Sequence, residues 1–188
     1  PILYRKKGLD PLKVIGVTTL DIVRANKFVH EKVGKPLDQI NVPVIGGHAG
    51  VTILPLLSQD PSAAGINAGE IPELDKRIQD AGTEVVNAKN GKGSATLSMA
   101  YAGARFGSAV LAGLAGEERT ECAYVASNIT DLPYFASKCT FGTTGIVKVH
   151  DIGQLNEHEK KRFEEVKTQL KEEIDAGLAY ANENELAS

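Results

Sequence analysis

Apolar residues recur every three or four positions in several long stretches of this chain, and that spacing predicts helices. Helices are expected over residues 18–33, 95–115 and 156–181. The last of them carries one apolar stripe among charged residues, formed by Phe163, Val166, Leu170, Ile174 and Leu178. The middle stretch is the most apolar of the chain, so we expect a buried helix there, whose alanines and glycines let neighbouring elements approach closely.

A further helix is expected to begin near Pro72, because proline is favoured in the first turn of a helix. Leu74 and Ile78, four residues apart, would lie on its inner side. Glycine is a poor helix former, so Gly82 is expected to break or bend this helix.

Short runs rich in β-branched residues predict strands at 13–17, 42–45, 51–57, 121–126, 135–141 and 145–149. Turn residues separate the last three runs, which favours an antiparallel meander. Pro55 lies inside one of the earlier runs and therefore requires a sheet edge or a bulge. Helices and strands come in blocks and do not alternate, so the predicted fold class is α+β and not a doubly wound parallel sheet.

The composition narrows the possible partners of the protein. The 188 residues are 42% hydrophobic and 24% charged with a formal net charge of −3, enough for one ordinary domain or two small ones. Without a basic excess, neither nucleic acid nor an anionic membrane surface is an expected partner. No run approaches the roughly 18 apolar residues of a membrane span. The chain starts at Pro1 and shows no signal or transit segment.

The two cysteines, Cys122 and Cys139, show no metal-ligand or redox spacing. Both lie in predicted strands, so we expect two buried free thiols. Unpaired thiols favour an intracellular compartment.

A glycine-rich loop with a single histidine, Gly46-Gly47-His48-Ala49-Gly50, separates two predicted strands. Glycine permits tight bends, so His48 could point into a cleft, and its unperturbed pKa of about 6.5 suits acid/base chemistry near neutral pH. A hairpin turn with a surface histidine is an equally open interpretation of this loop.

Asp21 and Arg24 are three residues apart on a predicted helix and therefore share a face. In one interpretation Thr18 is the helix N-cap, Asp21 completes a capping box and Arg24 is a surface charge. In the other, Asp21 orients His48 and Arg24 grips a carboxylate with its planar guanidinium. An acid/base, its orienting carboxylate and a carboxylate anchor together suit reversible oxidation of a hydroxy acid.

Several segments resemble malate dehydrogenases, most closely those of the mitochondrial and bacterial type. Thr18-Thr19-Leu20-Asp21-Ile22-Val23-Arg24-Ala25-Asn26 is similar to their substrate-binding helix. Residues 42–56, which contain His48, are similar to their catalytic loop. Gly93-Ser94-Ala95-Thr96-Leu97-Ser98-Met99 resembles the segment that meets the nicotinamide. The similarity extends over nearly the whole chain.

The resemblance implies a role for each of four residues. His48 would accept the proton in malate oxidation and donate it in oxaloacetate reduction, with Asp21 as its relay partner. Arg24 would bind a substrate carboxylate, and Met99 would contact the cofactor NAD. The family also implies a homodimer, and a C-terminal-domain fold in which long helices pack on an antiparallel sheet.

The resemblance also implies that residues 1–188 are one catalytic and substrate-binding domain. The family's N-terminal Rossmann domain, with its glycine-rich turn, has no counterpart in this sequence. Gly91-Lys92-Gly93 does not complete the G-x-G-x-x-G pattern. We therefore expect the substrate-side half of the enzyme, inactive by itself, from a mitochondrial matrix or a bacterial-type cytoplasm.

Two alternatives remain open at this stage, and a third is disfavoured. A lactate dehydrogenase would share the same acid/base and carboxylate anchor. A non-catalytic α+β interaction domain would leave Asp21, Arg24 and His48 apart in space. A metalloenzyme is not expected, because His30-Glu31 begins like a zinc motif but lacks the second histidine.

Overall fold

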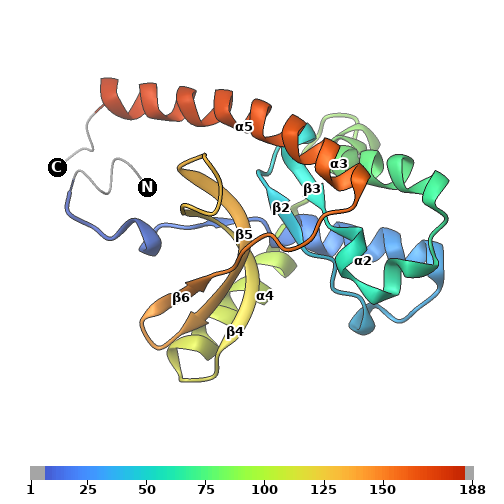
Figure 1. Ribbon diagram of the computed structural model, residues 1–188, viewed down its shortest axis with the longest axis horizontal. Helices are drawn as coiled ribbons and strands as arrows, with labels where there is room; N and C mark the ends of the chain where they lie inside the picture. Colours follow the sequence, from blue (N-terminus) through green and yellow to red (C-terminus); the bar gives the residue numbers. More distant parts are fainter. Residues whose placement is uncertain (1–6, 185–188) are drawn as a thin grey trace.

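The computed structural model describes residues 7–184, which form four α-helices around one antiparallel sheet (Figure 1). The helices are α2 (Thr19–Val33), α3 (Ile71–Ala88), α4 (Thr96–Leu114) and α5 (Glu157–Glu183). The strands are β1 (Gly16–Val17), β2 (Val44–Gly46), β3 (Ile53–Pro55), β4 (Arg119–Ala126), β5 (Tyr134–Gly142) and β6 (Gly145–Val149).

Strand β5 is the centre of the sheet. The strand order of the sheet is β1-β4-β5-β2-β3, with β6 also paired to β5, and every pairing is antiparallel. Strand β4 runs beside β5 from the pair Arg119–Phe141 to the pair Ala126–Tyr134. Pro55 lies on β3, an edge strand, where its missing N–H costs no ladder bond. The α+β prediction, the meander of β4 to β6 and the edge position of Pro55 are confirmed.

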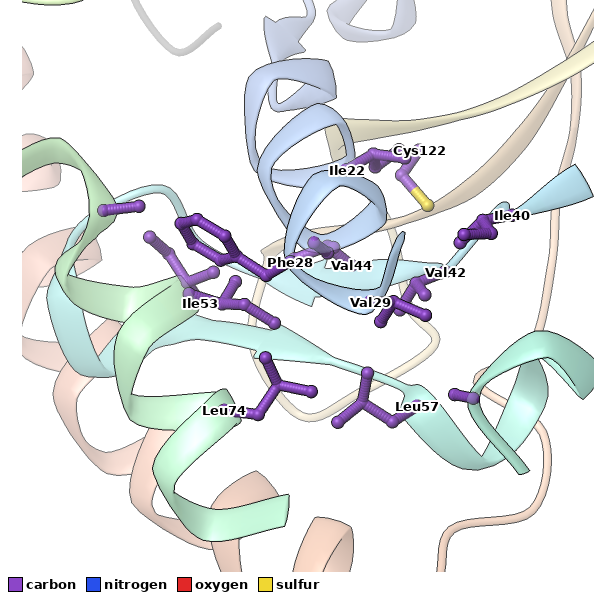
Figure 2. Packing of buried hydrophobic residues seen from close by; sticks show 14 residues of the cluster. Ile22, Phe28, Val29, Ile40, Val42, Val44, Ile53, Leu57, Leu74 and Cys122 are labelled. Atoms are coloured by element: carbon purple, nitrogen blue, oxygen red, sulfur yellow. The ribbon is translucent and has the colours of Figure 1, made fainter. Parts of the chain in front are cut away.

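Three hydrophobic clusters hold the helices to the sheet. In the first, α2 and α3 pack on β2 and β3 through Ile22, Val29, Val44, Ile53 and Leu74 (Figure 2). In the second, the predicted stripe of α5 buries Val166, Leu170 and Ile174 against β2, β3 and β5. In the third, α4 packs on β4 and β5. Helix α5 thereby crosses the end of the molecule that carries the loop between β2 and β3 (Figure 1).

Helix α3 runs without a break through Gly82, so the predicted break is wrong. One glycine inside a helix costs only about 1 kcal/mol relative to alanine. Burial of Leu74, Ile78 and Ala81 on the same helix outweighs that cost. The bare backbone of Gly82 instead faces the guanidinium of Arg24, 3.6 Å from the place of an added Cβ.

Helix α4 is buried on one face only, which corrects the expectation of a buried helix. Its inner face consists of Ala102, Phe106, Ala109 and Gly113. A Cβ on Gly113 would lie 2.7 Å from the backbone of Phe141, so the predicted close approach of small residues is confirmed there. Apart from Phe106, several large side chains lie on the outer face, and Leu97, Tyr101 and Leu111 are 86%, 63% and 67% exposed.

Both cysteines are buried free thiols, as predicted, Cys122 on β4 and Cys139 on β5. Burial raises the pKa of Cys122 to about 11 and that of Cys139 to about 12. Both thiols therefore stay protonated near neutral pH.

Within residues 7–184, the helices are too short or too polar to cross a membrane.

Candidate active site

The loop between β2 and β3 presents His48 at its tip. Gly46 has a φ of +99°, and a Cβ there would lie 2.2 Å from the carbonyl oxygen of Thr52. A Cβ on Gly47 would lie 2.5 Å from the Thr52 hydroxyl. Only glycine fits at both positions, so the Gly-Gly pair lets the loop fold closely onto its own far side.

Thr52 closes this loop through hydrogen bonds from the far side. Its hydroxyl donates to the carbonyl oxygen of Ala49 (2.8 Å) and accepts from the Ala49 N–H (3.1 Å). The Gly47 N–H donates to the Thr52 carbonyl oxygen (2.8 Å). Thr52 is completely buried, whereas the His48 side chain is 47% exposed. The loop is therefore anchored in the protein interior at Thr52 and presents His48 at the surface.

Asp21, in the first turn of α2, lies directly beneath His48. Its Oδ2 is 2.5 Å from Nδ1 of His48, and the carboxylate is fully buried. Thr18 occupies the N-cap position, but its hydroxyl donates to the carbonyl oxygen of Cys122 (3.5 Å) and makes no cap. The predicted capping box is thus wrong, because the Asp21 carboxylate is turned toward His48.

Arg24 joins the same group from one turn further along α2. Its Nη1 is 3.4 Å from Oδ1 of Asp21, and its side chain is 15% exposed. Within residues 7–184, Asp21 is the only ion-pair partner of Arg24. The pair is long, so the guanidinium retains donors for a further anion. The structure therefore brings together Asp21, Arg24 and His48, as the hydroxy-acid interpretation requires.

The pKa of His48 is raised above its ordinary value of 6.5. The hydrogen bond with Asp21 is the main cause, while burial and the positive charge of Arg24 oppose it. Asp21 acts on Nδ1, so the other ring nitrogen, Nε2, is the one available to a bound molecule. The imidazolium is thereby stabilised relative to that of an unperturbed histidine, which favours the uptake of a proton by His48.

A cavity of about 460 Å³ adjoins His48. Its walls include Val17, Thr18, His48, Tyr124, Leu170 and Glu173. They come from β1, the N-cap of α2, the loop after β2, β4 and α5. The cavity is large enough for a small organic acid beside one aromatic ring.

Met99 is not part of this constellation. It lies near the start of α4, is 39% exposed and is not among the residues that line the His48 cavity. No cluster of three or more histidine, cysteine, aspartate or glutamate side chains suited to a metal occurs within residues 7–184.

Sequence reasoning missed four residues that shape the site. Tyr124 and Glu173 line the cavity but come from a strand and a helix that no motif connects to His48. Thr52 lies inside the segment that resembles the catalytic loop, and only its hydrogen bonds with Ala49 show that it closes the loop. Gly82 is a glycine in a continuous helix opposite an arginine, and this could be recognised only from the packing of α2 on α3.

Comparison with known proteins gives a family at the level of sequence and a similar fold among solved structures. A family model described as the lactate/malate dehydrogenase alpha/beta C-terminal domain matches residues 18–181. Malate dehydrogenase 1, mitochondrial, of Arabidopsis thaliana is 52% identical over 183 residues, which are 96% of this chain and 54% of that protein. The chloroplastic malate dehydrogenase of the same plant is 53% identical, over 96% of this chain and 46% of that protein. The chain thus spans about half the length of these relatives.

Among solved structures, malate dehydrogenase from Salinibacter ruber matches with a TM-score of 0.79 at 21% identity, over 96% of this chain and 60% of that one. The apo malate dehydrogenase of Picrophilus torridus matches with a TM-score of 0.76 at 22% identity, over 96% and 57%. These similarities support the fold alone. The family model covers most of the chain and the observed fold agrees with it, so the chain belongs to the lactate/malate dehydrogenase family through its C-terminal domain.

Proposed function

We propose that this chain supplies the substrate side of an NAD-dependent malate dehydrogenase, which interconverts malate and oxaloacetate. The observation that carries the proposal is the cluster of His48, Asp21 and Arg24, joined by contacts of 2.5 and 3.4 Å. The cluster contains a proton carrier, a buried group that orients it and a carboxylate anchor. These are the protein groups that oxidation of a 2-hydroxy acid needs.

In malate oxidation, Nε2 of His48 takes the proton of the C2 hydroxyl as the C2 hydride leaves. Asp21 favours this step because its carboxylate stabilises the imidazolium that forms. In oxaloacetate reduction, the same imidazolium returns its proton to the carbonyl oxygen. General acid–base catalysis of this kind contributes about 10²–10⁴-fold to a rate.

Arg24 holds a substrate carboxylate in this proposal. A guanidinium presents two parallel N–H groups that match the two oxygens of a carboxylate. Asp21 lies on one edge of the Arg24 guanidinium and Gly82 lies against it, so the side chain has a defined orientation. Arg24 is not among the residues that line the cavity beside His48, so the substrate would have to reach from that cavity to the guanidinium.

NAD would supply the hydride acceptor for this reaction. The cavity beside His48 suits a nicotinamide ring in volume, and its wall includes the apolar side chains of Val17 and Leu170. Met99 is 39% exposed on α4 and lies outside the lining of this cavity, and we propose it as a contact of NAD beyond the cavity. Within residues 7–184 no glycine-rich turn leads from a strand into an α-helix, so the cofactor's phosphates would be held by a Rossmann domain outside these residues.

The proposal is tested in a two-part enzyme, in which this chain is joined to the part of Arabidopsis thaliana mitochondrial malate dehydrogenase that it does not cover. We expect NADH oxidation with oxaloacetate, lost on His48→Asn and kept on His150→Asn, a histidine bonded to Thr140 outside the cavity. The 188-residue chain alone is expected to show no turnover, because it lacks the orientation of hydride donor and acceptor. An active His48→Asn variant would refute the acid/base assignment.

Lactate dehydrogenase is the second candidate, because the family model covers both enzymes. A single carboxylate anchor such as Arg24 suits pyruvate as well as oxaloacetate. The same two-part enzyme separates them, and we expect a clear preference for oxaloacetate, as in the relatives at 52–53% identity, which are named malate dehydrogenases. A non-catalytic interaction domain would give no reason for a buried carboxylate to orient a half-exposed histidine.

We further propose a homodimer that forms through the outer face of α4. Leu97, Tyr101, Ala104 and Leu111 follow one another at helical spacing on the side of α4 opposite its buried residues. Exposed apolar faces of this kind mark interaction surfaces.

The curated relatives are named as mitochondrial, glyoxysomal and chloroplastic proteins, and we accordingly propose an intracellular compartment for this one.

A further inference from the structure

Arg162 of α5 is a buried arginine that reaches the loop behind His48. It is 6% exposed, and its Nη2 donates to the carbonyl oxygens of Val51 (2.9 Å) and Ile53 (3.3 Å). These carbonyls follow His48 by three and five residues, on the returning side of the loop. One guanidinium nitrogen therefore fixes two backbone groups of the segment that carries the proposed acid/base.

The remaining nitrogens of Arg162 are also occupied. Nε donates to Oδ2 of Asp75 (2.9 Å), a carboxylate of α3 that is 2% exposed, and Nη1 donates to Glu165 (2.9 Å). Asp75 also bonds His158 through Oδ2 (2.9 Å) and Gln79 through Oδ1 (3.0 Å). The charge of Arg162 is thus paired and its plane is fixed, as a buried cation requires.

Arg162 belongs to a row of α5 side chains that faces the loop. Val166 and Leu170 follow it at intervals of four and lie on the same face of the helix. A Cβ on Gly46 would lie 2.9 Å from Val166, and one on Gly47 would lie 3.1 Å from Leu170. The two apolar residues set how closely the loop approaches α5, and Arg162 sets its direction.

Helix α3 links this support to the carboxylate anchor. Asp75 holds Arg162, and Gly82, seven residues later on the same face, lies against the Arg24 guanidinium. The same helix therefore positions the anchor and, through Arg162, the loop of the acid/base.

We propose that Arg162 is a positioning residue: its two bonds to the Val51 and Ile53 carbonyls hold the His48 loop at hydrogen-bonding distance from Asp21. That the loop position matters for catalysis rests on the proposed function, whereas the hydrogen bonds from Arg162 to the loop do not depend on it. A lysine at this place would keep a positive charge near Asp75. It lacks the planar fork that serves the carboxylate and both carbonyls together.

The test compares Arg162→Lys with Arg119→Lys, a control at an exposed arginine paired with Glu117. Two quantities are measured by NMR on the whole chain: amide hydrogen exchange in the loop and the pKa of His48. In Arg162→Lys we expect the amides of Gly47 and Thr52 to exchange about tenfold faster, which corresponds to one net hydrogen bond. The pKa of His48 is expected to fall toward 6.5. The β4–β5 amides and the Arg119→Lys variant should match the parent chain.

If Arg162→Lys does not fold, the double variant Asp75→Asn with Arg162→Gln removes both buried charges together, which proteins tolerate better than a lone buried charge. The same two changes are expected in it. Unchanged loop exchange and an unchanged His48 pKa in a folded variant would overturn the proposal for Arg162. A pKa near 6.5 in the parent chain would instead refute the His48–Asp21 relay of the proposed function, while the exchange rates still decide the role of Arg162.

Discussion

His48 and Asp21 are 27 residues apart in the sequence, and Nδ1 of the histidine lies 2.5 Å from Oδ2 of the aspartate. The histidine is half-exposed and the aspartate is fully buried. The buried Asp21 carboxylate raises the pKa of its exposed partner His48 without contacting the substrate itself.

Replacing the relay carboxylate is expected to lower the pKa of His48. In Asp21→Asn the main cause of the raised pKa is gone, while burial and the charge of Arg24 still act against the imidazolium. The His48 pKa should therefore fall below its value in the parent chain, as measured by NMR titration of the imidazole. Asp38→Asn, at an exposed aspartate, is the matched control and should leave the titration unchanged. Equal pKa values in the parent chain and in Asp21→Asn would contradict this account.

The same pair makes stability depend on pH in a defined direction. The pKa of His48 is higher in the folded chain than the 6.5 of an unperturbed imidazole. Its contribution is therefore fully present below about pH 6.5 and is lost as the pH rises through the folded-state pKa. The Tm difference between the parent chain and Asp21→Asn should shrink from pH 6 to pH 9. A difference that grows over this range would have the wrong sign.

Arg24→Lys is expected to weaken substrate binding more than it weakens the fold. Lysine keeps the charge but loses the bidentate geometry, and hydrogen bonds to charged groups are worth about 1.5–3 kcal/mol. In the two-part enzyme, KM for oxaloacetate should rise about 10–100-fold. Arg77→Lys, at an exposed arginine paired with Glu31, should leave KM unchanged. If both variants bind oxaloacetate as the parent does, Arg24 is not the carboxylate anchor.

Gly46→Ala is expected to destabilise the chain more than the same change at a glycine of similar conformation. Gly46 and Gly116 have φ values of +99° and +95°, but only Gly46 faces a close neighbour, the Thr52 carbonyl oxygen. Gly46→Ala and Gly116→Ala both bear the strain of a positive φ, and overpacking adds about 1–3 kcal/mol to the loss of unfolding free energy at Gly46. Urea unfolding measures the difference in free energy. Equal losses at the two glycines would mean that the loop has room for a side chain.

Leu111→Glu is expected to dissociate the proposed dimer. Leu111 is 67% exposed on the outer face of α4, so the charge disturbs the interface and not the core. Sedimentation should show a dimer for the parent chain and a monomer for the variant. Val147→Glu, at a 47% exposed valine on β6, is the control and should remain dimeric. A parent chain that is monomeric at all accessible concentrations would argue against the dimer.

The parts of the site that sequence could predict are those with a local signature. Gly46-Gly47-His48 between two apolar runs, and Asp21 and Arg24 one helical turn apart, left a turn and a helix cap as open interpretations, and the resemblance to malate dehydrogenases favoured acid/base chemistry before the structure placed the three side chains together. The support of the site could not be predicted. Arg162 meets the Val51 carbonyl across 111 residues and Asp75 across 87, and no short-range pattern encodes such contacts.

Fold prediction failed where residue type and environment disagree. Leu97 and Leu111 are strongly apolar, yet they are exposed, because the inner face of α4 is formed by Ala102, Phe106, Ala109 and Gly113 and the sheet approaches Gly113 too closely for any side chain. Gly82 has a low helix propensity, yet the burial of Leu74, Ile78 and Ala81 on the inner face of α3 keeps it helical. In both cases tertiary packing overrode the local preference.

The most direct test of the central claim is the pH dependence of kcat/KM in the two-part enzyme, measured in both directions. Malate oxidation needs neutral His48 and oxaloacetate reduction needs its protonated form. The account therefore predicts that the first rate constant rises and the second falls through one shared pKa above 6.5, which Asp21→Asn moves downward. Two limbs that share no pKa, or a shared pKa that Asp21→Asn leaves in place, would contradict it.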